Sequence, residues 1–437
     1  MSSTVIHSVV LFDGHTTHPN ATVVFDTKSG KITSVSTSSS DAQHPSGATV
    51  IDGKDHTLLP GLIESHMHCH GLHLPPGGSM NDILRSPLKS GVTTVCDMHS
   101  DLGSVDTHRK SIANELAEAR KSGGTVTLSD LKSSLLGATI EGGWPKPIVL
   151  SGHPTEDVIE MVKKWPNLTP DTAAEYVRSH KASGANYIKL MQENCCSLAM
   201  PTNSVPVASL ELQSAVVKAA HEHGLPCVGH ALSVDMTEVI LNAGADGLTH
   251  TFVDQPPPQS IIDLYKKTGA FVIPTLTVLA SLTGELQDWR DRFADIAQKK
   301  GIVDDFAKQN MTELLGMKDP AAKLEYAFQT INKLKKEGID VVAGTDAVAG
   351  LKGTGIGPSL WMELELYVEK CGLSATEALS SATAVPAKRF GFSDRGEVVE
   401  GKRADLVLVK GDATKRLQSL WEGEGIVGVW KEGFRAG

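Results

Sequence analysis

The chain of 437 residues has little of several features that mark whole classes of protein. Its six cysteines are dispersed, which excludes the dense disulfide framework of small secreted domains and favours reduced thiols. No apolar run reaches the roughly eighteen residues that a membrane-spanning helix needs. The opening segment MSSTVIHSVVLFDG also lacks the basic and apolar regions of a secretory signal. We therefore expect a soluble, cytoplasmic protein with no membrane partner.

Positive charge is also scarce. The formal net charge is -10, and no segment is rich in lysine and arginine, which argues against a nucleic-acid partner. The hydrophobic fraction of 40% is high enough for one large core, so disorder is not the dominant expectation. A small molecule is the partner that this composition favours.

Short β-rich segments lie at both ends of the chain. Residues 4–59 contain TVIHSVVLFDG, ATVVFDT, KITSVS and ATVIDG, which are separated by turn residues. The same texture returns after residue 390 in GEVVEGKRADLVLVKGD and GIVGVWKEG. We expect residues 1–59 and 391–437 to form one composite β-sandwich domain.

Between these ends, residues 60–390 alternate short apolar stretches with helical patterns. Helices are expected at 104–122, 169–182, 209–223, 235–243 and 374–390, and residues 281–337 should hold extra helices that could cap a binding site. The eight candidate strands are PGLIESHMH, GVTTVCDM, KPIVLSG, GANYIKLM, LPCVGHA, GADGLTH, GAFVIPTLTV and GIDVVAGTDA. This alternation predicts an α/β fold, a parallel (β/α)8 or TIM barrel.

Polar residues end most of these strands. In GLIESHMHCHG, His66, His68 and His70 occupy every second position, so an extended chain directs them to one face. The strand-end residues are His66 and His68 on strand one, Lys189 on strand four, His230 on strand five, His250 on strand six and Asp346 on strand eight. Functional groups of such barrels lie at the carboxyl ends of the strands. A divalent cation would satisfy these six groups together, whereas burying them without a counter-ion is costly.

Lys189 is the unusual member, because it belongs to the apolar strand ANYIKLM. Burial drives a lysine toward the neutral amine or toward an ion pair. A neutral amine can add carbon dioxide and become a carbamate, which is an anionic oxygen ligand able to bridge two metals. The alternative is a salt bridge to Asp346 or Glu193.

Several motifs together resemble the landmarks of the metal-dependent amidohydrolase superfamily. They are LLPGLIESHMH, GVTTV, AAHEHGLPCVGHA, NAGADGLTH, VIPTLTV, VVAGTDA, GLSATEALSSATAVPAKRFGF and GEVVEGKRADLVLV, and they cover nearly the whole chain. The chain is most similar to the branch of imidazolonepropionase-like proteins, Xaa-Pro dipeptidase-like enzymes and fungal ochratoxinase-type amidases. Two departures are the loop MQENCCSLAMPTNSVP, which replaces a Gly-rich loop, and Leu232, which stands where many relatives have a histidine.

The resemblance implies a complete ligand set and a reaction. His66, His68 and Asp346 would hold one metal, His230 and His250 a second, and carboxylated Lys189 would bridge two divalent ions, with zinc expected. The implied enzyme is a binuclear hydrolase that cleaves the amide bond of an N-acyl amino acid, a dipeptide or a similar small amide through a metal-bridging hydroxide. Asp346 would be its catalytic proton carrier.

Residues that would contact the substrate are predicted from the loops that follow the strands. The polar candidates are His70, His99, His153, Gln192 and Asn194, and the apolar candidates are Leu72, Leu74, Met191, Leu198 and Met200. These apolar residues favour a substrate with a hydrophobic leaving or acyl group.

Other classes of function stay open at this point. One is a mononuclear, imidazolonepropionase-like or deaminase-type hydrolase of a cyclic C–N bond, in which a bridging carbamate is not needed. Another is a non-catalytic scaffold with the same fold, and a third is a metal-dependent decarboxylase, since a barrel does not fix the chemistry. Barrel hydrolases often associate, so a homo-oligomer is also an expectation, although no residue identifies an interface.

Overall fold

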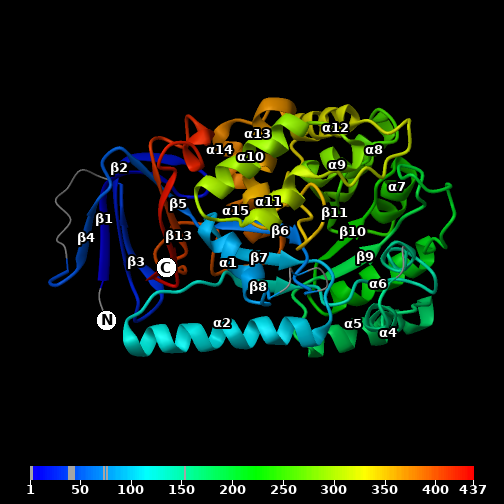
Figure 1. Cartoon of the computed structure of the whole chain (residues 1–437), viewed down its shortest axis with the longest axis horizontal. Helices are drawn as coiled ribbons and strands as arrows, with labels where there is room; N and C mark the ends of the chain where they lie inside the picture. The colour runs from blue at the N-terminus through cyan, green and yellow to red at the C-terminus, as the bar shows by residue number, and fades with distance from the viewer. Residues whose placement is uncertain (1–2, 38–44, 72–73, 75–76, 152–153) are drawn as a thin grey trace.

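Strands from both ends of the chain form one eight-stranded sheet in the computed structural model, which describes residues 3–37, 45–71, 74, 77–151 and 154–437. The strands are β1 (Ser3–Phe12), β2 (Thr17–Asp26), β3 (Lys31–Ser36), β4 (Thr49–Asp52), β5 (His56–Pro60), β13 (Leu406–Lys410), β14 (Ile426–Lys431) and β15 (Phe434–Arg435). The connection between the ends is the antiparallel pairing of β5 with β13, in which Leu58 lies opposite Leu408. The expected meeting of the two chain ends is therefore observed (Figure 1).

The apolar faces of these strands share one core. Ile6 and Val23 from the N-terminal strands pack in the same buried cluster as Leu406 and Trp430 from the C-terminal strands. Because β13 and β14 complete this core, neither chain end could bury its apolar residues alone.

In the described part of the chain, seven parallel strands form two sheets at the centre of the molecule. The first sheet consists of β6 (Leu62–Met67), β7 (Val92–Asp97) and β8 (Asp130–Ser133), and the second of β9 (Ile188–Met191), β10 (Cys227–His230), β11 (Gly247–Thr249) and β12 (Phe271–Ile273). Isolated parallel bridges join Ala138 to Leu190, Val272 to Val341 and Met67 to Ala347. The strands are almost entirely buried, as expected for parallel strands that are covered on both faces.

Helices surround these parallel strands (Figure 1). They are α1 (Asp82–Lys89), α2 (Leu102–Ser122), α3 (Lys146–Val149), α4 (Glu156–Lys163), α5 (Ala173–Ala182), α6 (Leu210–Glu222), α7 (Val234–Asn242), α8 (Gln259–Thr268), α9 (Leu276–Thr283), α10 (Gln287–Lys299), α11 (Asp305–Thr312), α12 (Leu324–Lys336), α13 (Pro358–Cys371), α14 (Ala375–Ser381) and α15 (Ala384–Arg389), with 3₁₀ turns at Pro170–Thr172 and Leu417–Leu420. The predicted helix at 374–390 is two helices, and 281–337 does hold several. Within the described ranges, no helix is both long and apolar enough to span a membrane.

The third parallel strand is not where the sequence pattern placed it. The segment KPIVLSG contains helix α3, and the strand is β8, which lies earlier in the chain. Pro147 explains the error, because a proline cannot donate a ladder hydrogen bond in a central strand but is tolerated in the first turn of a helix. The eighth predicted strand contributes only the isolated bridges of Val341 and Ala347.

A buried ion network joins the parallel strands to the segment that leads into β13. Arg395, whose side chain is 2% exposed, pairs with Asp130 of β8 at 2.5 Å and donates to Thr94 Oγ1 of β7 at 2.8 Å. Arg403 also pairs with Asp130, at 3.1 Å. Burial alone would raise the pKa of Asp130, but the two guanidinium groups hold this pKa well below its usual range.

The substitution Arg395→Met should lower the free energy of unfolding by about 3 kcal/mol, because it leaves Asp130 buried with one partner fewer. Urea denaturation of the full chain measures this loss. The matched control is Lys163→Met, which removes the exposed Lys163–Glu160 pair and should leave the urea midpoint unchanged. Equal midpoints for Arg395→Met and the wild type would contradict the structural role of the network.

Candidate metal centre

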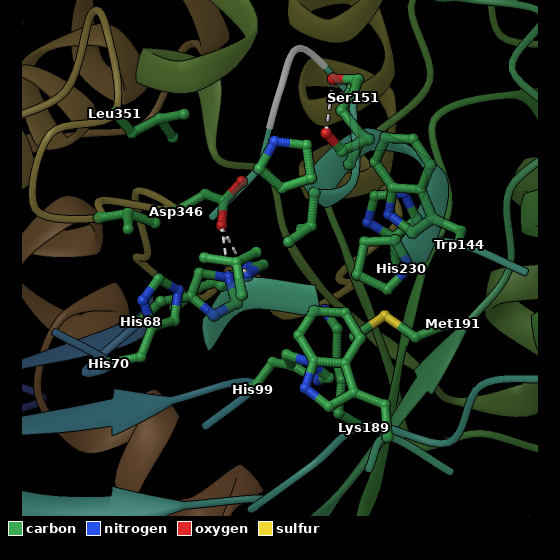
Figure 2. A pocket seen from close by; sticks show the side chains of 18 of the residues that line it. His68, His70, His99, Trp144, Ser151, Lys189, Met191, His230, Asp346 and Leu351 are labelled. Carbon is green, nitrogen blue, oxygen red and sulfur yellow. Dashed lines mark hydrogen bonds and ion pairs between the residues drawn. The ribbon is translucent and has the colours of Figure 1, made fainter. Parts of the chain in front are cut away.

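A cavity of about 580 Å³ lies at the carboxyl ends of the parallel strands and gathers all the predicted metal ligands. The side chains come from the end of β6 and the residues after it (His66, His68), from β9 (Lys189), from the last residue of β10 (His230), from the residue after β11 (His250) and from the segment between Val341 and Ala347 (Asp346). Figure 2 shows His68, Lys189, His230 and Asp346 around this cavity. The juxtaposition is observed, and the role of these residues as ligands remains a prediction.

His66, His68 and Asp346 form the tighter group. The Nε2 atoms of His66 and His68 lie 3.1 and 3.0 Å from the same oxygen, Asp346 Oδ1. Ligand atoms of the three residues all lie within 4.8 Å of one another, as one metal ion requires. Gly344 permits this approach, because a Cβ atom at that position would lie only 2.8 Å from the backbone nitrogen of His66.

Glu64 lies beneath this group and ties its two segments together. Its carboxylate accepts hydrogen bonds from the backbone N–H groups of His66 and Thr345, both at 3.0 Å, and from Thr345 Oγ1 at 2.9 Å. Burial raises the pKa of Glu64 to about 8. The carboxyl group thus fixes β6 relative to the segment that carries Asp346.

His230 and His250 form the second group. Their ring centroids are 4.6 Å apart, and the His250 centroid is 5.0 Å from that of His66. Each ring has a separate partner, because His250 Nδ1 lies 2.7 Å from Thr275 Oγ1 and His230 Nε2 lies 3.2 Å from Glu193 Oε2. The other ring nitrogen of each histidine, Nε2 of His250 and Nδ1 of His230, can therefore make another contact.

The backbone turns sharply at three of these positions. His250, Thr275 and Asp346 have φ values of 70°, 53° and 60°, in the left-handed region that residues other than glycine rarely adopt. Such conformations cost of order 1–3 kcal/mol each and persist where the surroundings enforce them. Here the side chains of His250 and Asp346 line the cavity, and the Thr275 hydroxyl contacts His250.

Lys189 is buried and has no carboxylate partner. Its Nζ donates to Thr249 Oγ1, and no Asp or Glu among the described residues lies within ion-pair distance of it. Burial lowers the pKa of Lys189 to about 7, so a large fraction is the neutral amine near neutral pH. The predicted alternative of a salt bridge to Asp346 or Glu193 is therefore not observed, and the amine has the protonation state that carbamate formation needs.

The protonation states of the other residues also fit a divalent metal. Burial, followed by the nearby Lys189, lowers the pKa of His66 to about 3, and burial lowers the pKa of His230 and His250. Burial alone would raise the pKa of Asp346, but His66 and His68 hold this pKa well below its usual range. Neutral imidazoles and an ionised carboxylate are the forms that bind metals, and this donor set suits zinc.

The polar residues predicted for the substrate pocket divide into two groups. His70 and His99 line the cavity, and His99 Nδ1 accepts the Gly137 N–H at 2.8 Å, which places the imidazole hydrogen on Nε2. His153 lies outside the described residues.

Gln192 and Asn194 are not among the residues that line the cavity. Gln192 donates to the carbonyl of Ala208 at 3.2 Å, and Asn194 accepts from the Cys196 N–H at 3.2 Å. Buried amides need such partners, so these hydrogen bonds stabilise the loop that follows β9.

The wall of the cavity contains two tryptophans that the sequence analysis did not identify. Trp144 is stacked on His230 with ring centroids 5.4 Å apart, and Trp165 meets His99 edge-on at 4.3 Å. Other apolar lining residues from this region are Pro145, Ile148, Val149, Pro154 and Val158. Of the predicted apolar residues, Met191 lines the cavity, Leu74, Leu198 and Met200 do not, and Leu72 lies outside the described residues.

Comparisons with known proteins find similar sequences. The chain is 22% identical to ochratoxinase of Aspergillus niger over 402 residues, which cover 86% of this chain and 75% of that protein. It is 30% identical to enamidase of Eubacterium barkeri over 117 residues, or 27% of this chain and 28% of that protein.

Solved structures share the fold over almost the whole chain. A Xaa-Pro dipeptidase with bound methionine has a TM-score of 0.71 at 22% identity, and the match covers 99% of both chains. Phenylurea hydrolase B has a TM-score of 0.74 at 20% identity, covering 100% of this chain and 97% of that one. These likenesses show that the chain shares its fold with these structures.

A family model settles the relationship. The model described as the amidohydrolase family matches residues 57–435, which include all the described residues that line the cavity and the strands β13, β14 and β15. The chain therefore belongs to the amidohydrolase family and is a hydrolase that acts on carbon–nitrogen bonds.

Proposed function

We propose that this protein is a binuclear metal-dependent hydrolase that cleaves the amide bond of a small, largely apolar substrate. The observation that carries the proposal is the convergence of four histidines, Lys189 and Asp346 on one cavity that also has an indole wall. Similar proteins that are named as hydrolytic enzymes, namely ochratoxinase, Xaa-Pro dipeptidase and molinate hydrolase, support it.

The finer fold assignment belongs to the same proposal. The parallel strands would close into an eight-stranded (β/α)8 barrel, with the segment around Val341–Ala347 as the eighth strand. Support comes from the bridges Ala138–Leu190, Val272–Val341 and Met67–Ala347, which link the two parallel sheets and return to β6. The terminal strands would form the accompanying β-sandwich.

The residues present fit a two-metal centre. His66, His68 and Asp346 would hold one divalent ion, His230 and His250 the other, and carboxylated Lys189 would bridge them, with zinc as the expected metal. When bound, the two ions would supply a water of lowered pKa and a Lewis acid for the substrate carbonyl.

The chain's own groups then perform the proton transfer. Asp346 is ionised at neutral pH, so its carboxylate can accept a proton from the attacking water and deliver it to the leaving nitrogen. Asp346 Oδ1 lies 3.1 and 3.0 Å from the Nε2 atoms of His66 and His68, so the carboxylate is positioned beside the site where the first ion would bind. The products would be a carboxylate and an amine.

The substrate should carry an apolar or aromatic group and no free carboxylate near the scissile bond. Trp144 and Trp165 offer flat apolar surfaces, and Ile148 and Val158 extend the wall. Among the described residues that line the cavity, Lys189 is the one lysine or arginine, and it is assigned to the metals. A neutral amide with an aromatic or branched apolar side is thus favoured over a dipeptide with a free α-carboxylate.

A mononuclear hydrolase is the second candidate. It is favoured by one observation, namely that His66, His68 and Asp346 are the one group of potential ligands within 4.8 Å of one another in the described parts of the chain. Metal stoichiometry distinguishes the two, because a single ion would occupy this group and leave Lys189 as an amine.

Substitution of Lys189 tests the binuclear proposal. Wild-type protein purified without chelator should contain about two metals per chain by elemental analysis, in keeping with a two-metal hydrolase site. Lys189→Met, which keeps the bulk and loses the amine, should lose at least one metal and amide hydrolysis. The control Lys132→Met alters a lysine of β8 that does not line the cavity, and it should keep the metal content and the amide hydrolysis of the wild type. One metal per wild-type chain, with Lys189→Met still active, would contradict the proposal.

Substitution of Trp165 tests the assigned substrate class. Trp165→Ala should raise KM roughly tenfold for an N-acyl aromatic amide, because stacking and apolar contact are lost. Hydrolysis of a short aliphatic amide should change much less. The control is Trp289→Ala on α10, which does not line the cavity. An equal effect on both substrates would show that Trp165 does not select the aromatic group.

A further inference from the structure

Glu193 is a buried carboxylate beside His230 and His250, and it is not one of the predicted metal ligands. Its side chain is 0% exposed, its Oε2 lies 3.2 Å from His230 Nε2, and its Oε1 accepts the Cys195 N–H at 2.6 Å. No lysine or arginine in the described part of the chain pairs with it. Because a buried charge needs compensation, its contact with His230 requires a functional explanation.

The contact determines which nitrogen of His230 is available to a metal. A carboxylate only accepts hydrogen bonds, so Nε2 carries the hydrogen and Nδ1 keeps its lone pair. Trp144 covers one face of the ring at an interplanar angle of 24°, which opposes rotation of the imidazole. His250 has the opposite arrangement, because its Nδ1 contacts Thr275 Oγ1 and its Nε2 is the nitrogen available to a metal.

We propose that Glu193 is the positioning residue of the second metal site. It holds His230 in the Nε2–H tautomer, directs Nδ1 toward the metal and increases the basicity of the ring through its negative charge. The inference rests on the proposed two-metal function. His66, His68 and Asp346 contact one another and not Glu193, so the influence of Glu193 should be confined to the ion that His230 binds.

Zinc titration of the metal-free full chain against a chromophoric chelator tests this assignment. Glu193→Gln, which keeps the shape and loses the charge, should weaken the second zinc by about tenfold, and Glu193→Leu by up to about a hundredfold. The first zinc should bind as in the wild type in both variants. Unchanged affinity for the second zinc in Glu193→Leu would overturn the proposal, and so would equal weakening of both ions, which indicates a structural role.

A second readout does not depend on metal. In the metal-free protein, ¹⁵N NMR of the imidazoles should show His230 protonated at Nε2, and Glu193→Leu should show a mixture of tautomers. The His230 signal is identified by its loss in His230→Asn. If the wild type binds one zinc, the two-metal function fails, and this spectrum still decides the role of Glu193. A wild-type His230 protonated at Nδ1 would overturn it.

Discussion

The cavity depends on the hydrogen bonds that Glu64 accepts from His66 and Thr345. These contacts join the first parallel strand to the segment that carries Asp346, although the two are far apart in the chain. Gly344 allows the backbones to approach closely enough. Together with the hydrogen bond from the Asp346 N–H to the His66 carbonyl at 2.7 Å, this connection brings His66 and His68 to the Asp346 carboxylate.

The predicted ligands were accessible from the sequence because of a simple geometric rule. Residues at the carboxyl ends of parallel strands share one face, so the strand pattern alone places the HxH pair, Lys189, His230, His250 and Asp346 together. The pairing of the chain ends was also predictable, because both ends have short alternating strands. This rule predicts that these residues lie close together, but it does not predict the hydrogen-bond partners of each side chain.

The residues missed by the sequence analysis show where such a rule stops. Trp144 precedes helix α3 and Trp165 follows helix α4. Because the segment KPIVLSG between them was predicted as a strand, their position over the cavity could not be deduced. Gln192 was expected to face the substrate, yet its amide is held inside the protein by Ala208 and Gln213. Glu193 was visible only as a possible partner of Lys189. Which way a loop side chain turns depends on hydrogen bonds between distant segments, and these have no local sequence signal.

The antiparallel pairing of β5 with β13 has a consequence for the order in which the molecule is built. The ribosome makes β5 before all the parallel strands, but its partner strand β13 is made only after them. Such long-range pairing is slow and leaves strand edges exposed in the meantime. The nascent chain therefore carries an unpaired edge of β5 while the parallel strands are made, and this is a stage at which a chaperone would protect it from aggregation.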